Sequence, residues 1–286
     1  MMQVEYVHHM GTDLSVVNAA RVSFAQDSDW PVTVHSGEMD TLKPKDHRLI
    51  KYLAKHRHMS PFGHAFASFH IKAPVFVARQ LVKHKFLRWN EISRRYVDEE
   101  PEFYVPEVWR GRSADKKQGS EGVVTHMDIG CGCEECCPPD GTMLHPLEDW
   151  VQGFNLQAFE DYTTLIKSGV APEQARMVLP QSTMTEWYWS GSLDAFHDMC
   201  ALRQAPDTQA ETRDIADAIA SKMAELFPAS WPALDDWHPL NRVATLERDL
   251  AYAIDALHEI KGEVGASTNG YIRSIAAEVL QSLGAA

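Results

Sequence analysis

The sequence predicts a fold that combines α-helices with β-strands, and three observations support this prediction. Strand-like alternation and helical spacing both occur within the first 110 residues. Helical spacing then predominates from residue 147 to residue 227. The chain has 286 residues, 44% of them hydrophobic, so it can bury the core of one elaborate domain or of two small ones.

Two helices are expected near the N-terminus. The stretch "NAARVSF" predicts a short helix that runs into an extended segment. The stretch "DHRLIKYLAKHRH" predicts a longer helix, with Asp46 as its N-terminal cap. Its buried face is expected to hold Leu49, Tyr52 and Leu53.

A strand and a third helix follow. In "FASFHIKAP", Phe69, Ile71 and Ala73 alternate with polar residues, which is typical of a strand with one buried face. Pro74 suits the start of a helix, and "VFVARQLVKHK" continues with helical spacing. The basic residues that come next are therefore expected to begin on a helix and to run off its end into a loop.

Residues 111–146 are rich in Gly, Pro, Asp and Cys and lack periodicity, so we expect a long surface insertion there. A helix is expected from Leu147 to Gly169, and a shorter one between Pro172 and Pro180. The stretches "LDAFHDMCALR" and "TQAETRDIADAIASKMAELF" predict two more helices.

The end of the chain predicts a separate helical segment. Its apolar residues recur at steps of three and four, which is typical of an amphipathic helix. These residues are Leu246, Leu250, Ile254 and Leu257. We expect this helix to pack on its own domain or on a copy of itself. The expected organisation is a single main domain over residues 1–228 and a helical extension over residues 229–286.

The formal net charge of -13 argues against nonspecific binding to nucleic acid or anionic lipid, because both need extended basic surface. No window approaches 18 consecutive apolar residues. The stretch "MMQVEYVHHMGTDLS" lacks the charged start and apolar run of a signal peptide. We therefore expect a cytoplasmic protein without membrane or nucleic-acid partners.

One stretch, "VKHKFLRWNEISRRYV", concentrates positive charge in this acidic chain. Together with the residue Arg79 just upstream it contributes six positive side chains: Arg79, Lys83, Lys85, Arg88, Arg94 and Arg95. One interpretation is a solvated helix face. The other is a phosphate site, since Arg binds phosphate oxygens bidentately and Lys adds a point charge. The rings of Trp89 and Tyr96 could then cover a base or a flavin.

Four blocks of this sequence resemble, in order and spacing, the flavin-dependent thymidylate synthases. They are "HRHMSPFGH", "FHIKAPVFVARQLVKHK", "NEISRRY" and "LPQSTMTEWYWSGSLDAF", the last of which continues to "ALR" at residues 201–203. The resemblance spans about residues 15–226 and implies an α+β fold, with a mixed or antiparallel sheet and flanking helices. It also implies a homotetramer with its sites at subunit interfaces, and a catalytic role for residues 1–228.

The family signature is Arg-His-Arg, two variable residues, Ser, a variable residue, Asn-Glu, a variable residue, Ser, a variable residue and Arg-Tyr. Here Lys83, His84 and Lys85 stand for the first three residues, and Arg88 stands for the first Ser. The remaining positions match at Asn90, Glu91, Ser93, Arg95 and Tyr96. The charge is kept, but Lys cannot form the bidentate fork of Arg.

The resemblance implies a reaction and a set of site residues. The protein would use NADPH to reduce FAD, and would transfer the one-carbon unit of methylenetetrahydrofolate to C5 of dUMP, giving dTMP. Arg203 would be catalytic, because a fixed arginine stabilises negative charge over N3 and O4 of uracil. The implied substrate-binding residues are Gln80, Lys83, Glu91, Ser93, Arg94, Arg95, Arg176 and Arg203. The implied cofactor-binding residues are Ser23, His58, Ser60, Lys83, His84, Lys85, Glu91, Ser192 and Asp198.

Alternative functions stay open at this point. A related enzyme would hydroxymethylate C5 of the pyrimidine or accept dCMP. An inactive nucleotide-binding paralogue is also compatible with Lys83, Lys85 and Asp198, the last of which stands where some family members have Asn. The sequence contains neither GxGxxG after a strand nor GxxxxGK[ST], so Rossmann and P-loop binding are not expected.

The insertion contains four cysteines within seven residues: Cys131, Cys133, Cys136 and Cys137. Cys133 and Cys136 have CxxC spacing, but the second pair of a strong zinc motif is missing. We therefore expect free thiols in a surface loop, with a structural zinc ion as the alternative. The family reaction implies no metal.

Overall fold

The computed structural model describes residues 1–31, 42–97, 100–114, 119–128 and 144–240, together with Leu250 and Ile254. The chain divides into two compact units, Met1–Ala233 and Leu234–Ala286. All sites discussed below belong to the first unit. The cysteine cluster and most of the amphipathic tail lie outside the described residues. The zinc alternative, the tail helix and the domain boundary at residue 228 therefore stay predictions.

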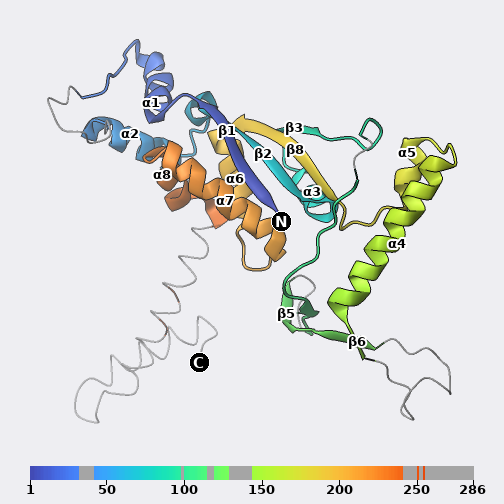
Figure 1. The fold of residues 1–286 in the computed structure, drawn as a ribbon. Helices are drawn as coiled ribbons and strands as arrows, with labels where there is room; N and C mark the ends of the chain where they lie inside the picture. The colour runs from blue at the N-terminus through green and yellow to red at the C-terminus, as the bar shows by residue number, and fades with distance from the viewer. Residues whose placement is uncertain are drawn as a thin grey trace, which may run out of the picture. The chain divides into compact units, whose positions relative to one another are not determined.

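A four-stranded sheet forms the centre of the first unit (Figure 1), with strand order β1-β2-β8-β3. Its strands are β1 (Gln3–Met10), β2 (Phe66–Pro74), β8 (Met184–Ser192) and β3 (Arg88–Glu91). All three pairings are antiparallel. This confirms the antiparallel sheet of the expected α+β fold.

Helices and 3-10 turns flank this sheet. The α-helices are α1 (Asp13–Arg21), α2 (Pro44–Lys55), α3 (Val75–Leu81), α4 (Leu147–Lys167), α5 (Pro172–Ala175), α6 (Leu193–Arg203), α7 (Ala210–Leu226) and α8 (Ser230–Trp237). The 3-10 turns are η1 (Val22–Phe24), η2 (Ser60–His64) and η3 (Arg176–Val178). Two short ladders pair β4 (Arg110–Arg112) with β5 (Ser120–Val123), and β6 (His126–Asp128) with β7 (Leu144–Pro146). None of the described helices is long and apolar enough to cross a membrane.

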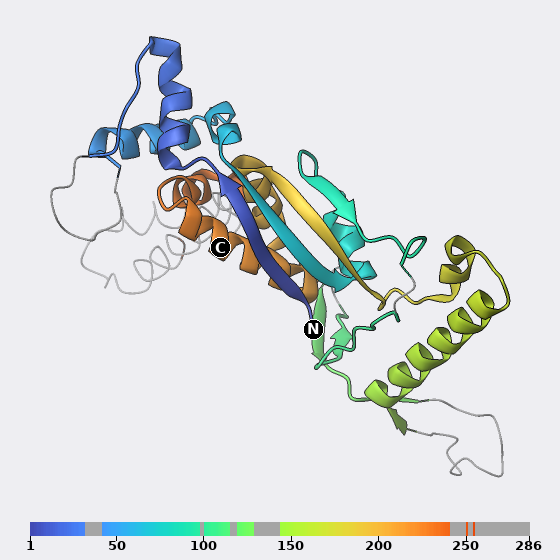
Figure 2. The same ribbon diagram turned by 45° about the horizontal axis from the view of Figure 1, so that its top comes forward.

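The core lies between the sheet and helices α3, α6 and α7, which pack against β2, β8 and β1 respectively (Figure 2). Phe69 of β2 is fully buried and lies directly opposite Trp189 of β8. The ring of Phe196 from α6 meets both rings edge to face, at centroid distances of 5.3 and 5.6 Å. Aromatic packing of this kind fixes α6 against the centre of the sheet.

The alternation predicted for β2 is confirmed. Phe69, Ile71 and Ala73 are all fully buried. His70 and Lys72, on the other face of the strand, are half-buried. A period of two in burial is what a strand with one covered face produces. The left-handed backbone of Gly169, with φ of +85°, also ends α4 as expected.

The predicted cap of α2 was wrong, and of the three residues predicted for its buried face only Leu53 is buried. The cap position is Lys43, with Pro44 in the first turn, whereas Asp46 lies inside the helix and is fully buried. Asp46 accepts hydrogen bonds from Arg21 and from Ser28 Oγ, the latter at 2.6 Å. Because this polar contact turns Asp46 inward, the buried face rotates to Asp46, Ile50, Leu53 and Ala54. Leu49 is only half-buried and Tyr52 is 54% exposed.

Other local expectations also needed correction. The segment after α1 is a 3-10 turn rather than extended, and it ends at Ala25 with φ of 50°. The helix expected up to Pro180 is one α-turn followed by η3. Helix α3 ends at Leu81, so the basic stretch does leave a helix, but it then forms strand β3 instead of only a loop. The hydrogen-bonding edge of β8 is what orders this strand.

Phe69→Ala is expected to lower the free energy of unfolding by about 3–5 kcal/mol, because the ring is fully buried and the cavity left behind cannot collapse completely. Phe24→Ala is the matched control, since Phe24 is 78% exposed; its effect should stay within about 0.5 kcal/mol. Denaturant titrations of both variants test this. Equal destabilisation would show that the core is not centred on Phe69.

Candidate active site

Arg203, the last residue of α6, is held by two acceptors from the neighbouring helix and turn. Its Nε donates a hydrogen bond to Nε2 of His84 at 2.9 Å. Its Nη2 donates to the backbone carbonyl oxygen of Gln80 at 3.0 Å. The structure therefore joins three of the residues predicted from the sequence, although 119 positions separate His84 from Arg203.

The electrostatics of this contact leave the imidazole neutral. Burial and the adjacent charge of Arg203 lower the pKa of His84 to about 4, against a smaller opposite effect of Asp198. Burial also lowers the pKa of Arg203, but a guanidinium stays protonated in proteins. At neutral pH an uncharged ring and a carbonyl thus hold a full positive charge.

A cavity of about 740 Å³ opens beside Arg203. Gln80 and Arg203 form one part of its wall. Aromatic rings of Phe76, Tyr104 and Trp109 form another part. Burial and the charge of Glu211 raise the pKa of Tyr104 to about 12, so its hydroxyl stays protonated and can donate a hydrogen bond. The cavity can therefore receive a flat polar ring.

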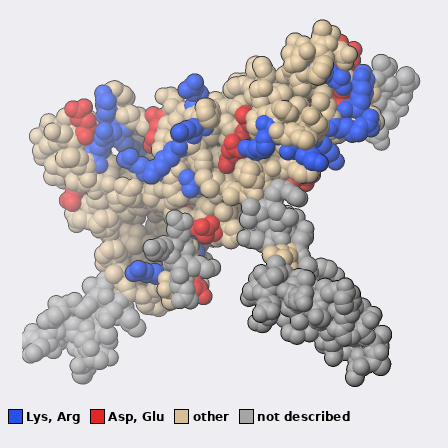
Figure 3. Space-filling view, turned by 180° about the vertical axis from the view of Figure 1, so that it is seen from behind, with Lys and Arg blue, Asp and Glu red and all other residues tan. Residues whose placement is uncertain are grey.

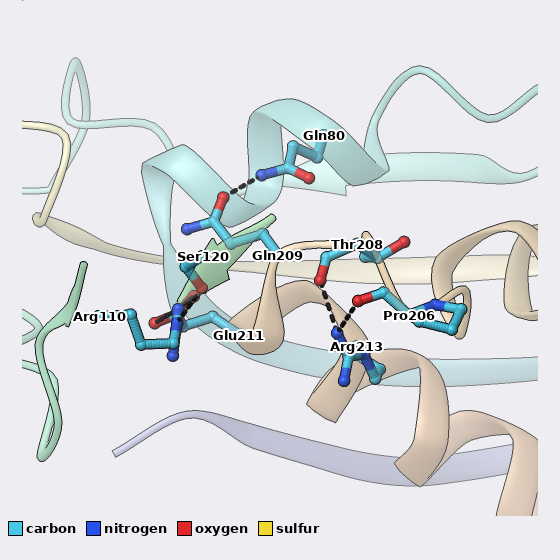
Figure 4. A network of polar contacts seen from close by, with 8 residues as sticks. All are labelled: Gln80, Arg110, Ser120, Pro206, Thr208, Gln209, Glu211 and Arg213. Carbon is cyan, nitrogen blue, oxygen red and sulfur yellow. Dashed lines mark hydrogen bonds and ion pairs between the residues drawn. The ribbon is translucent and has the colours of Figure 1, made fainter. Parts of the chain in front are cut away.

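A polar network contributes to the lining of the same cavity (Figure 4). The Nη2 atom of Arg110 donates to both carboxylate oxygens of Glu211, at 2.7 and 2.6 Å, and its Nε donates to Ser120 Oγ at 3.0 Å. Burial of the Glu211 carboxyl raises its pKa, but the hydrogen bonds and charge of Arg110 outweigh this and lower it overall. This ion pair attaches the β4–β5 hairpin to the start of α7.

The loop between α6 and α7 is fixed by the same network. The side-chain amide of Gln80 donates to Gln209 Oε1. Arg213 Nη2 donates to the carbonyl oxygens of Pro206 and Thr208, at 2.9 and 2.8 Å (Figure 4). Gln80 therefore contacts the loop through its side chain and Arg203 through its backbone.

A second group of predicted residues surrounds Glu173. Arg95 Nε lies 3.8 Å from the Glu173 carboxylate, and Arg176 Nε donates to the Glu173 carbonyl at 3.3 Å. Arg95 also donates to the hydroxyl of Tyr96 at 2.7 Å, and its guanidinium lies over that ring. The structure thus brings Arg95 and Arg176 together around one residue.

Glu91 and Ser93 lie at the end of the edge strand β3. The Glu91 carboxylate accepts hydrogen bonds from Thr185 Oγ1 at 2.7 Å and from Trp89 Nε1 at 3.0 Å. Ser93 Oγ accepts a long hydrogen bond, 3.4 Å, from the backbone N–H of Arg95. In the described part of the chain, no hydrogen bond or ion pair joins Glu91, Ser93, Arg95 or Arg176 to Gln80, His84 or Arg203. Trp89 stacks on Trp187 at 4.3 Å, so this face of its ring is already covered.

The predicted cofactor residues lie on segments that pack against one another. Turn η2, which begins at Ser60, packs against both α1 and α6. Ser192 occupies the N-cap position of α6, and the N–H of Leu193 donates to the Ala65 carbonyl at 2.8 Å. Ser23 follows α1 and is exposed.

The remaining cofactor residues are also at the surface. His58 is exposed, and its ring stacks on Tyr52 at a centroid distance of 6.1 Å. Asp198 is exposed on α6. Lys83 and Lys85 are exposed in the turn after α3. His84 is the exception among these, because its ring is half-buried against Arg203.

Comparison with known proteins places the chain in a family. A family model described as "Thymidylate synthase complementing protein" matches residues 5–229. The chain belongs to this family, the flavin-dependent thymidylate synthases. The family member from Thermus thermophilus is 39% identical over 233 residues, covering 82% of this chain and 75% of that protein. The member from Kosmotoga olearia is 35% identical over 80% of this chain and 88% of that protein.

A solved structure shows a similar fold. The UMP/dUMP methylase PolB from Streptomyces cacaoi, bound with 5-Br dUMP, superposes with a TM-score of 0.63 at 28% identity. The match covers 83% of this chain and 96% of that chain. The antiparallel sheet with flanking helices is thus shared with a nucleotide-modifying enzyme.

Several described side chains of this family member have the chemistry to bind an anionic cofactor. Lys83 and Lys85 form no hydrogen bond or ion pair with any other described residue, so both ammonium groups are available to phosphate. The Ser192 side chain makes no capping bond to α6, so its hydroxyl is available too. Lysines and hydroxyls are the donors that a flavin nucleotide needs for its phosphates and its polyol chain.

Sequence reasoning missed several residues that line the cavity together with Arg203. Arg110, Glu211, Tyr104 and Gln209 were not singled out, and Arg110 and Glu211 are 101 positions apart. The one local feature that could have drawn attention to Glu211 is its place in the first turn of α7, but acidic residues are common at helix starts. Nothing in the sequence indicated that this carboxylate is buried.

Glu211→Gln is expected to lower the free energy of unfolding by about 1–3 kcal/mol, because a buried carboxylate that holds Arg110 loses its charge. Glu225→Gln is the matched control on the same helix. Glu225 pairs with Lys222 at the surface, where an ion pair is worth about 0–1 kcal/mol. Denaturant titrations compare the two. A larger effect at Glu225 would contradict the assigned role of the Arg110–Glu211 pair.

The depressed pKa of His84 makes stability depend on pH in a defined direction. The ordinary value is 6.5, so below this pH the unfolded chain gains a proton that the folded ring accepts only near pH 4. Stability contributed by the neutral ring is full above pH 6.5 and is lost as the pH falls toward 4. Wild type should therefore lose stability relative to His84→Gln over this window, measured by denaturant titration. A constant difference between pH 7 and pH 4 would show that the His84 pKa is not depressed.

Proposed function

We propose that this protein catalyses the reductive methylation of dUMP to dTMP. Methylenetetrahydrofolate would supply the carbon, NADPH the reducing equivalents and FAD the bound flavin; the products are dTMP, tetrahydrofolate and NADP⁺. The observation that carries this proposal is Arg203, held beside a 740 Å³ cavity by two uncharged acceptors. Family membership and the nucleotide-modifying neighbour support it.

Arg203 is suited to activate the pyrimidine. C5 of uracil becomes nucleophilic when negative charge is stabilised over N3 and O4, and a preorganised cation does this without a proton transfer of its own. A guanidinium has five N–H donors, and Arg203 uses two of them on His84 and Gln80, which leaves three for a ligand. The aromatic side chains of the cavity would cover part of a bound ring, and lower polarity there would strengthen this interaction.

We propose that Arg95 and Arg176, which both contact Glu173, bind the phosphate and sugar. Arg94 would add charge, and Glu91 and Ser93, at the end of β3, would add acceptors and a hydroxyl. Lys and Arg side chains gather in patches on one face of the molecule despite the net charge of -13 (Figure 3). In a homotetramer, Arg95 and Arg176 of one subunit would complete the Arg203 cavity of another. The homotetramer and the cytoplasmic location stay predictions.

The flavin would supply hydride transfer next to the nucleotide. Lys83 and Lys85 would hold its phosphates as point charges, and Ser23, Ser60 and Ser192 would bind its hydroxyls. His58 would lie near the folate and nicotinamide. Asp198, when ionised, can only accept hydrogen bonds, so it would bind a donor group of the cofactor.

The test is product formation by the purified protein with FAD, NADPH, methylenetetrahydrofolate and dUMP, with UMP and dCMP offered separately. We expect dUMP to yield dTMP. Arg203→Ala should lower the rate by roughly 100- to 1000-fold, the usual effect of removing a group that stabilises developing negative charge. The control is Arg48→Ala, an exposed arginine of α2, which should keep the wild-type rate. Unchanged dTMP formation by Arg203→Ala would refute the proposed role of Arg203.

A further inference from the structure

Family resemblance assigns His84 to the flavin, yet in the structure its ring binds Arg203. We propose that His84 is a positioning residue for Arg203, whose uncharged imidazole fixes the guanidinium while leaving its positive charge free to act on the nucleotide. This inference rests on the proposed function, because it deepens the role of Arg203 in that reaction.

His84 and the Gln80 carbonyl together orient the guanidinium of Arg203. Arginine carries about 2 kcal/mol of rotamer entropy, so one hydrogen bond does not hold it in a single pose. The carbonyl of Gln80, near the end of α3 where helical carbonyls lack intrahelical partners, fixes Nη2. His84 fixes Nε from the turn that follows α3. Two acceptors at different atoms of the planar guanidinium set its plane.

The hydrogen bond also defines the state of the ring. A nitrogen that accepts from Arg203 carries no proton, so the neutral ring has its proton on Nδ1. The charged groups that act on the ring are Arg203 and Asp198, and they shift its pKa in opposite directions. Burial lowers the pKa most, and the effect of Arg203 exceeds that of Asp198, so the ring stays uncharged at neutral pH.

A second arginine of the same cavity provides the comparison. Arg110 is bound by the Glu211 carboxylate, which is buried and compensates its charge. That contact suits a structural clamp between the β4–β5 hairpin and α7. Arg203 has a ring and a carbonyl where Arg110 has a carboxylate. A carboxylate at position 84 would hold Arg203 more tightly but would cancel the charge that the chemistry needs.

Three substitutions at position 84 separate two effects on Arg203: loss of the hydrogen-bond acceptor that orients it, and addition of a negative charge beside it. His84→Gln offers a neutral oxygen close to the position of Nε2. His84→Glu has the same shape and also accepts, but it is negatively charged. His84→Leu removes the acceptor. We expect kcat for dTMP formation to stay within about tenfold of wild type in His84→Gln, and to fall by on the order of 100-fold in both other variants.

The comparison of His84→Gln with His84→Glu decides the inference, because the two side chains have the same size. A purely structural role predicts equal kcat for these two variants, and that result would overturn the proposal. Wild-type kcat in His84→Leu would overturn it as well. Flavin affinity, measured by absorbance titration, is the second readout. If all three variants recover wild-type kcat at saturating FAD, His84 serves the cofactor and the proposal is wrong.

A measurement without turnover keeps this test independent of the proposed function. NMR of ¹⁵N-labelled histidine side chains should show His84 with a protonated Nδ1 and a pKa well below the ordinary value. Arg203→Gln should raise that pKa, because a neighbouring positive charge is removed. If wild type forms no dTMP but these signals appear, the proposed function fails while the His84–Arg203 contact stands. A His84 that titrates normally in wild type overturns the inference whatever the enzyme makes.

Discussion

The contact of Arg203 with His84 and with the Gln80 carbonyl is the point on which the arrangement of the site depends. Strands β2 and β8 are paired from end to end, so Pro74 lies opposite Met184 and Phe66 lies opposite Ser192. Helix α3 starts directly after β2 and α6 directly after β8, at opposite ends of this pair. Eight strand steps span roughly 27 Å. Helices α6 and α3 are about 16 and 10 Å long, so together they are about as long as the strand pair. Because the two helices run toward each other under one face of the sheet, they meet at their C-terminal ends.

Charge is distributed between two arginines of one cavity according to what each must do. The Glu211 carboxylate compensates the positive charge of Arg110, and this ion pair joins the β4–β5 hairpin to α7. Arg203 keeps its charge because its partners are neutral. Since burial penalises the unpaired guanidinium, as the lowered pKa of Arg203 shows, this arrangement costs stability. A strained electrostatic arrangement of this kind is expected where a ligand completes it.

The sequence predicted what depends on local pattern and on motifs. Strand β2 was expected because Phe69, Ile71 and Ala73 alternate, and Arg203, Gln80 and His84 were named from the resemblance to the family. The predictions that failed concern residues whose structure depends on partners far away in the sequence. Asp46 was expected to cap a helix, but Arg21, 25 positions away, turned it inward. Strand β3 exists because β8 offers it a hydrogen-bonding edge, and the Arg110–Glu211 pair joins residues that share no local motif.

The expected departures from the family signature at positions 83 and 85 also separate residues that supply charge from a residue that accepts a hydrogen bond. The resemblance implies an arginine on each side of the signature histidine, and this chain has lysines there, at positions 83 and 85; both are exposed without a partner among the described residues. A lysine can replace an arginine where only a point charge is required, as it is beside a phosphate. The histidine between them contacts Arg203 through a specific ring nitrogen, and neither lysine nor arginine can accept a hydrogen bond there. Among the first three signature positions, the side chain that this chain keeps is therefore the one whose hydrogen-bonding role has no cationic substitute.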